Sequence, residues 1–583
     1  MDQLRLVAAF DELCQGVSGN IRALYRSKDT KGRPCSVLYY FWAMQVPCPA
    51  CHLSVDLFSS WVIARNAYPS RKPEVQILCP SCADIFPGLH GQEAATCRSC
   101  KTRFDPQRGP AQGAKATCQH CSRSFTILDA VASTGTRPAF RLYGKLVLTR
   151  SGTKEYLPAT AEVLAAYQQC SAQLQEDTSH GLLLPTLALE HGYNTRQAMS
   201  YGFTTWRDFF NDRQLLALGW LHTAIDRLAD APSRDALLTL FSGVLEFNNM
   251  FASYKGEGTG AVRHMFSHHI LKPERTPIEA NVWGTPKSSG SFSNLFRSRL
   301  LRAIEYRLAP TEVNGKTGKG RVCASPFSGH VEAGWPTNGR FSERAIYLSC
   351  GDSAHTGLPP RSVDLVVTDP PFFDNVHYSE LADFFHAWQQ LTPSTLLDKS
   401  TTTRSPLEVQ DSDADHFAAK LRSVFDECHR LLKDDGLLVF TYHHSRDEGW
   451  KALADAVLGG GFTVVNSQPV KAEMSVATPK SQAKEPIQLD IIIVCRKEGT
   501  VDTLRPSVNQ AIESAKLKLR RLLAAGFDLS RNDRRIVLFG QLLTTLTSPE
   551  DAEQLAFHSD IQLDEIKAVR APVNPENQLL LFE

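Results

Sequence analysis

The residues most able to do chemistry begin at Asp369, which is followed by Pro370, Pro371 and Phe372. An apolar run at 363–367 precedes them and predicts a buried parallel strand that the two prolines end. Ligands of open α/β sheets bind just beyond the carboxyl ends of such strands. There a planar heterocycle could stack on Phe372 while its amino group donates hydrogen bonds to the carboxylate and the Pro370 carbonyl. The spacing therefore predicts a site for an exocyclic amine on a nucleobase-like ring.

Such an amine is a poor nucleophile because its lone pair is delocalised into the ring. Two acceptors on its hydrogens favour the pyramidal geometry that can attack a methyl group. A base in a duplex must leave the stack to reach this pocket, and stacking on an aromatic ring offsets part of that cost. The structural alternative is a proline-ended strand whose Phe372 and Phe373 are core residues.

Alternating patterns after the motif predict the elements that position it. We expect a helix over 417–432, a strand over 437–444, a helix over 450–458, and closing strands over 462–465 and 489–494. This order indicates a parallel sheet that ends in an antiparallel hairpin. His443 and His444 end the second strand, where they either face the same cleft or are hydrogen-bonded structural groups.

Eight of the fifteen cysteines occur as four Cys-x-x-Cys pairs. They are Cys48/Cys51, Cys79/Cys82, Cys97/Cys100 and Cys118/Cys121. One turn presents two thiolates to a tetrahedral ion and a second turn completes the set. In sequence order, the pairs predict four-cysteine zinc ribbons over 48–82 and 97–121. Pairing of 79/82 with 97/100 is the alternative, because the interval between them also suits a ribbon.

Composition excludes several classes of protein. The chain has 583 residues, of which 42% are hydrophobic and 21% charged, as in globular proteins of several domains. No apolar run approaches the ~20 residues of a membrane helix, and the first residues do not read as a signal peptide. The net charge is +1, but residues 97–155 hold eleven Lys and Arg against three acids. This basic segment either faces phosphates or is a solvated surface without a partner. The ribbons likewise either contact DNA or only stabilise the fold of a small domain.

Further motifs carry a family resemblance. They are Phe-Thr-Thr-Trp-Arg-Asp-Phe-Phe-Asn-Asp-Arg (203–213), Glu-Ala-Asn-Val-Trp-Gly (279–284), Ser-Gly-Ser-Phe (289–292) and Asp-Pro-Pro-Phe-Phe-Asp-Asn-Val-His-Tyr-Ser-Glu-Leu (369–381). With the ribbons, they resemble the large adenine-specific DNA methylases that contain a zinc ribbon, which often carry a domain of unknown function numbered 1156. The likeness runs over nearly the whole chain.

The resemblance implies an α/β fold: a partial Rossmann-like methyltransferase sheet that depends on S-adenosyl-L-methionine (SAM), N-terminal four-cysteine zinc ribbons, and a mainly helical insertion. It implies catalytic roles for Asp369, Pro370, Pro371 and Phe372. It implies cofactor contacts for Gly351, Asp352 and Asp369, with a strand over 345–348 beside the motif strand. It implies a target or DNA loop of Phe373, Asp374, Asn375 and Tyr378.

The same resemblance implies the reaction and its partners. The cofactors are SAM and two structural Zn²⁺ ions, and the partner is double-stranded DNA. The reaction is methyl transfer to adenine N6, with cytosine N4 as the alternative. We expect a cytoplasmic enzyme of a bacterium or archaeon, in a restriction-modification or phage-defence system.

The chain departs from that family in one respect. Members carry a Phe-x-Gly-x-Gly cofactor loop in an N-terminal region, and here the glycine-rich segments 256–260 and 315–320 follow no apolar strand. Either a separate polypeptide supplies the loop, or the gene start is misplaced, or the chain is a degenerate remnant. The first two predict an enzyme that is active once completed. The third predicts a catalytically inactive zinc-ribbon DNA-binding protein.

We expect five regions along the chain. They are an N-terminal helix and strand left from a longer region (1–45), two zinc ribbons (46–130), a mostly helical DNA-recognition region (131–340), the methyltransferase half-domain (341–498) and a helical tail (499–583).

Overall fold

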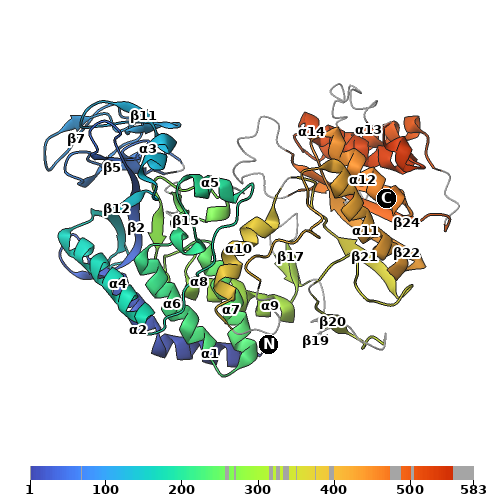
Figure 1. Ribbon diagram of the computed structural model, residues 1–583, viewed down its shortest axis with the longest axis horizontal. Coiled ribbons are helices and arrows are strands. Elements are labelled where there is room, and N and C mark those ends of the chain that lie inside the picture. Colours follow the sequence, from blue (N-terminus) through green and yellow to red (C-terminus); the bar gives the residue numbers. More distant parts are fainter. Residues whose placement is uncertain are drawn as a thin grey trace. The chain divides into compact units, whose positions relative to one another are not determined.

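The computed structural model describes residues 2–555 except 67, 256–260, 268–270, 314–319, 323–328, 333–339, 350, 375, 393–399, 473–486, 501–504 and 554. The chain divides into two compact units (Figure 1). The first comprises Met1–Phe327 and Tyr378–Thr403, and the second comprises Ser328–His377 and Arg404–Glu583. The boundaries differ from the five predicted regions, because α10 (Tyr378–Gln389) belongs to the first unit although it follows the motif strand.

An antiparallel sheet organises the first unit. Its strands lie in the order β1 (Arg26–Lys28), β2 (Pro34–Pro47), β12 (Ala139–Leu148) and β13 (Lys154–Pro158), and β3 (Ser54–Asp56) and β16 (Ile278–Ala280) also pair with β2. Strand β2 is apolar on both faces because each face contacts a different core. Tyr40 and Trp42 contact the helical core, whereas Tyr39 and Phe41 contact a core shared with the ribbon strands.

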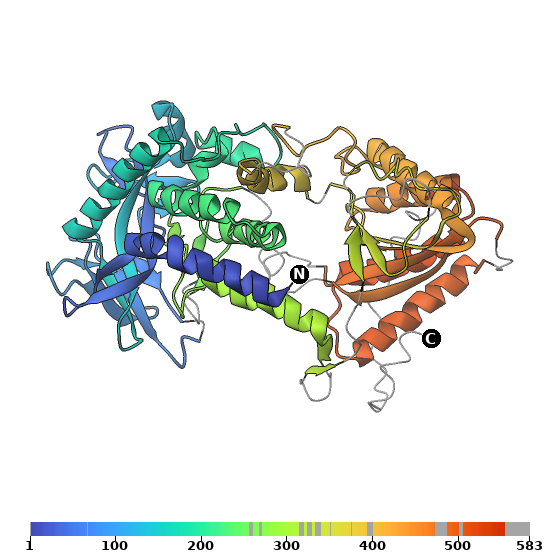
Figure 2. The ribbon, with the colours of Figure 1, turned by 90° about the horizontal axis from the view of Figure 1, so that it is seen from below.

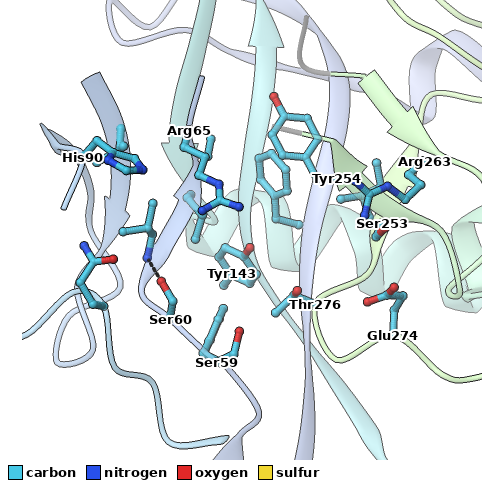
Figure 3. Close-up of a pocket in the computed structure, with 18 of the residues that line it drawn as sticks. Ser59, Ser60, Arg65, His90, Tyr143, Ser253, Tyr254, Arg263, Glu274 and Thr276 are labelled. Atoms are coloured by element: carbon cyan, nitrogen blue, oxygen red, sulfur yellow. Dashed lines mark hydrogen bonds between the residues drawn. The ribbon is translucent and has the colours of Figure 1, made fainter. Parts of the chain in front are cut away.

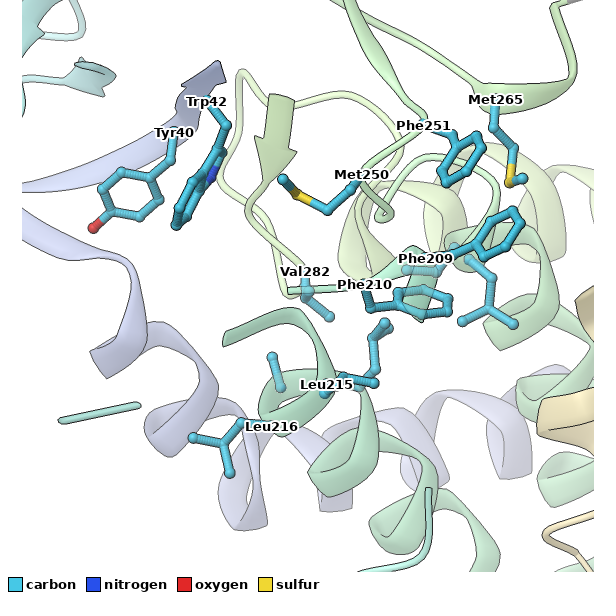
Figure 4. Close-up of a cluster of buried hydrophobic side chains, with 14 of the residues drawn as sticks. Tyr40, Trp42, Phe209, Phe210, Leu215, Leu216, Met250, Phe251, Met265 and Val282 are labelled. Carbon is cyan, nitrogen blue, oxygen red and sulfur yellow. The ribbon is translucent and has the colours of Figure 1, made fainter. Parts of the chain in front are cut away.

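Helices cover one face of this sheet. They are α1 (Gln3–Gly16), α2 (Ser18–Leu24), α4 (Ala161–Ser179), α5 (Thr195–Ser200), α6 (Asp212–Asp226), α7 (Ala231–Leu245), α8 (Phe292–Leu295), the π-turn of Phe296–Leu301, α9 (Arg302–Leu308) and α10. Figure 2 shows α1 beside the helix formed by 292–308, where the Phe10 and Phe296 rings stack with centroids 3.9 Å apart. Figure 4 shows side chains from β2, α6 and the loops before β16 meeting in one apolar cluster. Within 131–340, the strands β12 and β13 come first and helices follow in the middle.

A buried ion pair lies between the sheet and α6. Arg213 Nε donates to Glu279 Oε1 at 2.6 Å, and both side chains are fully buried. Trp42 Nε1 and Asn211 Nδ2 also donate to the Glu279 carboxylate, at 3.0 and 2.9 Å. The loop after β16 is closely packed around Gly284, which has a φ of +101°. A Cβ atom at this position would lie 2.1 Å from Ser291 Oγ. The polar motif 279–284 is thus a structural network in the core.

The ribbon region is built from short strands. They are β4 (Val62–Ala64), β5 (Glu74–Leu78), β6 (Ile85–Leu89), β7 (Ala95–Thr96), β8 (Arg103–Phe104), β9 (Ala111–Gln112), β10 (Lys115–Thr117) and β11 (Ser124–Thr126), followed by helix α3 (Ile127–Thr134). The remaining small strands are β14 (Ser253–Lys255), β15 (Ala261–Arg263), β17 (Thr311–Val313), β18 (Gly320–Val322), β19 (His330–Glu332) and β20 (Ala345–Tyr347).

A four-stranded sheet organises the second unit. Its order is β21 (Val363–Thr368), β22 (Leu432–Tyr442), β24 (Leu489–Lys497) and β23 (Phe462–Lys471), with β21 and β22 parallel and the other pairs antiparallel. Helices α11 (Ala414–Leu431), α12 (Asp447–Gly459), α13 (Val508–Ala524) and α14 (Arg531–Leu542) share its core. The predicted order of strands and helices after the motif is confirmed, including the final hairpin. The tail helices are part of this core rather than a separate region.

One predicted strand lies elsewhere. Strand β20 pairs in parallel with β19 in a separate two-stranded sheet, and none of the described residues pairs with the outer edge of β21. The prediction that 345–348 lies beside the motif strand is therefore wrong. One face of β21 is also open, with Leu365 and Val367 exposed by 50% and 69%. No helix in the described part of the chain is long and apolar enough to cross a membrane.

Candidate active site and metal centres

The motif lies where the sequence predicts it, at the carboxyl end of β21. Strand β21 ends at Thr368, and Asp369 follows with its side chain exposed. Thr441, near the carboxyl end of the parallel neighbour β22, donates a hydrogen bond from Oγ1 to Asp369 Oδ1. Pro370 is buried and Pro371 half-buried, so the turn is held by packing. One carboxylate oxygen of Asp369 is thus oriented by the protein, and the other carries no hydrogen bond among those of the described residues.

Phe372 lies against the end of β22. Its ring centroid is 4.5 Å from that of His443 at an interplanar angle of 60°, and 5.5 Å from that of Tyr442 in an edge contact. His443 Nδ1 in turn forms a hydrogen bond with Asp490 Oδ1 at the start of β24. Because β24 runs antiparallel to β22, its first residues reach the same edge of the sheet. The edge therefore gathers two carboxylates, an imidazole and an aromatic ring.

The residues after the motif anchor the loop. Phe373 is 1% exposed, adopts a left-handed φ of 58°, and packs its ring on Phe417 at 5.4 Å. The predicted place of Phe373 in a DNA-contacting loop is therefore wrong, because burial keeps its ring in the core. Asp374 accepts a hydrogen bond from Arg446 Nη2 at 2.6 Å, and its Oδ1 lies 3.6 Å from His444 Nε2.

The ionisation of this cluster follows from its packing. Burial alone would raise the pKa of Asp374, but the hydrogen bond and the charge of Arg446 outweigh it and lower the pKa. Burial is the main cause of the lowered pKa of His444, whose Nδ1 accepts the Arg446 N–H at 3.1 Å. A Cβ on Gly449 would meet His444 Nδ1 at 2.5 Å, so helix α12 must start close to this ring. His444 is thus a hydrogen-bonded structural group.

The other predicted site residues are less closely gathered. Asp352 forms a turn, accepting from Ala354 N at 2.9 Å and pairing with His355 Nδ1 at 3.0 Å. The turn leads to Thr356, which donates to Glu427 near the C-terminal end of α11. Gly351 and Asp352 therefore do not end a strand of the motif sheet. Tyr378 is 60% exposed and begins α10 in the first unit, and Asn375 lies outside the described residues.

The eight paired cysteines form two groups of four. One group is Cys48, Cys51, Cys118 and Cys121, and the other is Cys79, Cys82, Cys97 and Cys100. The sequence-order pairing is therefore wrong, and the alternative that joins 79/82 with 97/100 is found, with the outer pairs joined around it. The groups are nested because the first turn lies between β2 and β3, and the last turn, between β10 and β11, returns beside it.

The geometry of both groups fits a tetrahedral zinc ion. The Sγ–Sγ distances are 3.6 Å for Cys48–Cys121, Cys51–Cys118 and Cys82–Cys97, and 3.5 Å for Cys79–Cys100. Four sulfurs at the ~2.3 Å bond length of zinc would lie about 3.8 Å apart. The residue after each second cysteine has a φ of about +60° and donates its N–H to the carbonyl of the first cysteine. These residues are His52, Ala83, Lys101 and Ser122. Four identical turns in a conformation that side chains disfavour indicate metal-binding knuckles.

Three residues at the motif edge of the sheet were not predicted as site residues. Thr441, Arg446 and Asp490 are remote from the motif in sequence, and only the pairing of β22 with β21 and β24 brings them to it. Asp490 carried one usable signal, since it is an acid directly before the apolar run 491–495.

Comparison with known proteins supports the chemistry of this edge. Residues 363–535 match a family model described as DNA methylase. The match begins with β21 and ends in α14, so it covers the motif, the sheet and its helices. It supports a DNA methyltransferase that acts on N6 of adenine or N4 of cytosine. No curated protein matches the chain.

Proposed function

We propose that this protein is a SAM-dependent DNA methyltransferase that methylates adenine N6 and resembles the zinc-ribbon methylases with the 1156-type domain. The observation that carries the proposal is the exposed Asp369 at the carboxyl end of β21, one oxygen of which is held by Thr441. The family match to 363–535 supports the reaction class. A bacterial or archaeal modification or phage-defence system is the setting that the resemblance implies.

The chain's own groups suffice to bind and activate the amine. An extrahelical base would lay its ring on Phe372, and its amino group would donate to Asp369 and to the Pro370 carbonyl. The Thr441 hydroxyl occupies Oδ1 of Asp369, which leaves Oδ2 for the amine. The N–C bond would form as the S–C bond of the methyl donor breaks, with its electron pair left on sulfur. The amine would then pass one proton to Asp369, which already accepts its hydrogen bond. The buried turn keeps these acceptors fixed, so little reorganisation accompanies the reaction.

SAM would supply the methyl group, but the described residues provide only one side of a site for it. No glycine-rich loop follows a strand of the motif sheet among them, and Asp352 is not at its edge. The open face of β21, with Leu365 and Val367 exposed, lies where a further strand and helix would pack. We propose that a separate subunit or segment carrying the cofactor loop pairs with β21 and completes the site.

The DNA duplex would contact the basic ribbon surface. Five basic side chains around 97–123 are all exposed, namely Lys101, Arg103, Arg108, Lys115 and Arg123. Cations on a rigid module contact phosphates without reading sequence, so they position the duplex while the motif acts on the base. The zinc ions would make that module rigid.

Methyl transfer from tritiated SAM to duplex DNA tests the proposal. The protein is assayed alone and with the products of neighbouring genes. Asp369→Ala is expected to abolish transfer, whereas Asp364→Ala serves as the matched control, because that carboxyl group is 79% exposed on the same strand. Mass spectrometry of nucleosides should detect N6-methyladenine, and N4-methylcytosine would instead identify cytosine as the target. Transfer undiminished in Asp369→Ala refutes the proposal.

The open face of β21 favours a second candidate, an inactive zinc-ribbon DNA-binding protein that retains the sheet. Calorimetric titration with SAM distinguishes the two. Binding, alone or with a completing subunit, supports the enzyme. Absence of binding in both conditions, together with retained DNA binding, supports the second candidate.

A further inference from the structure

A pocket of roughly 450 Å³ lies in the first unit, where the ribbon strands meet the antiparallel sheet. Strands β4 and β5 form one wall, β2 and β12 the floor, and the β14–β15 hairpin with residues 274–278 the other wall. Its volume lies within the ~300–1,000 Å³ typical of small-molecule sites. The pocket contains none of the motif residues, which belong to the second unit.

Aromatic side chains line the floor and one wall of the pocket. Phe41, Phe58 and Tyr143 are buried there, and Tyr254 is half-buried. The Tyr254 hydroxyl forms a hydrogen bond of 2.5 Å with that of Tyr156, and its ring makes an edge contact with Phe41 at 5.2 Å. These contacts fix the Tyr254 ring. A fixed aromatic ring in a pocket provides a stacking surface for any nucleobase.

The rim of the pocket is polar and mainly cationic. Figure 3 shows Tyr254 between the side chains of Arg65 and Arg263, with His90 at one end and Glu274 below Arg263. Guanidinium groups bind phosphate through paired N–H donors. Burial raises the pKa of Glu274 in spite of the neighbouring positive charge of Arg263. A carboxyl group in such a place pairs with the exocyclic amine of a base.

From this arrangement we infer that the pocket binds a nucleotide, with the base on Tyr254, its amino group at Glu274, and its phosphate on Arg65 and Arg263. Two sources share this chemistry, a nucleotide of a DNA strand and a free mononucleotide. The choice of DNA rests on the proposed function, whereas nucleotide binding itself does not. The zinc knuckle at Cys79 directly follows β5, so the inner group of four cysteines holds one wall of the pocket in place.

Calorimetric titration of the intact protein with deoxynucleoside monophosphates tests the inference. dAMP and dCMP are expected to bind more tightly than dTMP, which lacks an exocyclic amine, and more tightly than deoxyadenosine or inorganic phosphate alone. Tyr254→Ala should weaken dAMP binding by roughly 5- to 150-fold, the range found when a stacking ring is removed. Tyr254→Phe should retain binding because the ring remains.

Two further variants test the pocket independently, in case Tyr254→Ala fails to fold. Arg263→Gln should weaken dAMP binding far more than deoxyadenosine binding, because its main loss is a phosphate contact. Arg71→Gln is the matched control, since Arg71 is exposed in the same ribbon but does not line the pocket. A short single-stranded oligonucleotide that binds more tightly than dAMP, and loses affinity in Arg263→Gln, identifies the strand as the source.

If dAMP instead binds more tightly than the oligonucleotide, the ligand is a free mononucleotide. The inference is overturned if no mononucleotide or oligonucleotide binds. It is also overturned if binding is unchanged in Tyr254→Ala and Arg263→Gln. Methyl transfer in the same preparation is measured separately with Asp369→Ala. An active enzyme without nucleotide binding at Tyr254 would leave the proposed function intact, and binding at Tyr254 without methyl transfer would leave this inference intact.

Discussion

The nested arrangement of the two cysteine groups makes a prediction about zinc content that no other pairing makes. Cys51 and Cys121 belong to one group, whereas Cys51 and Cys82 belong to different groups. The double variant Cys51→Ser/Cys121→Ser should therefore keep one of two zinc ions. The double variant Cys51→Ser/Cys82→Ser should keep none. The sequence-order pairing predicts the opposite result for each.

Each thiolate contributes a large share of the free energy that holds a structural zinc ion. A structural zinc site contributes about 10–16 kcal/mol of apparent binding free energy, comparable with the ~5–15 kcal/mol of a whole domain. A site with three of its four thiolates should thus lose zinc during purification with a chelator. The two ions also differ, because Cys51 and Cys118 are 67 residues apart and Cys82 and Cys97 only 15. Closing the longer interval costs about 1.3 kcal/mol more entropy, so the outer ion should bind roughly ninefold more weakly.

Zinc is measured by inductively coupled plasma mass spectrometry on protein dialysed against a chelator. Cys14→Ser is the control, because Cys14 lies in helix α1 outside both groups. The affinity difference is measured by chelator competition on variants that retain a single site. Zinc content of zero in Cys51→Ser/Cys121→Ser and one in Cys51→Ser/Cys82→Ser would refute the nested pairing.

Three other predictions follow from single contacts. Thr441→Val should lower kcat/KM for methyl transfer about tenfold and Thr441→Ser should not, because only the valine removes the hydrogen bond to Asp369; equal rates contradict this role. Glu279→Gln should lower the free energy of unfolding in urea by about 3–5 kcal/mol, since it leaves its buried guanidinium partner uncompensated; a loss under 1 kcal/mol would speak against it. The hydrogen bond and charge of Arg430 lower the pKa of Glu427 to about 2, so this pair stabilises the fold at pH above about 4.5 and the stability is lost as the pH falls towards 2. Glu427→Gln should flatten that part of the stability profile, and an unchanged acid transition counts against it.

Local patterns were sufficient for the elements of the second unit. Alternating apolar runs predicted β22, β23 and β24, and the helical period over 417–432 predicted α11, because each element buries one face in a single core. Cys-x-x-Cys spacing likewise predicted the knuckles, since each one is completed within a few residues. Elements and turns of this kind can be predicted because they depend on residues that are close in the sequence.

Pairing over long distances in the chain was decided only by the tertiary structure. Which knuckles share an ion depends on where β2 and β9 to β11 lie, and two residues between thiolates carry no information about that. The strand over 345–348 has an ordinary strand pattern, yet its partner is β19 and not β21. Phe373 looked like a loop residue beside the motif, but a left-handed turn directs it into the core.

The sequence by itself determined the reactive motif, the metal-binding turns and the order of elements around the motif, because these follow from residue type and from periodicity along a few turns of chain. The tertiary structure alone decided which distant groups share one site. Thr441, Asp490 and Asp369 meet because strand pairing brings them to one edge of a sheet. Arg65, Tyr254 and Glu274 meet because a ribbon packs on a sheet. Such contacts depend on packing between segments far apart in the chain, which no local pattern records.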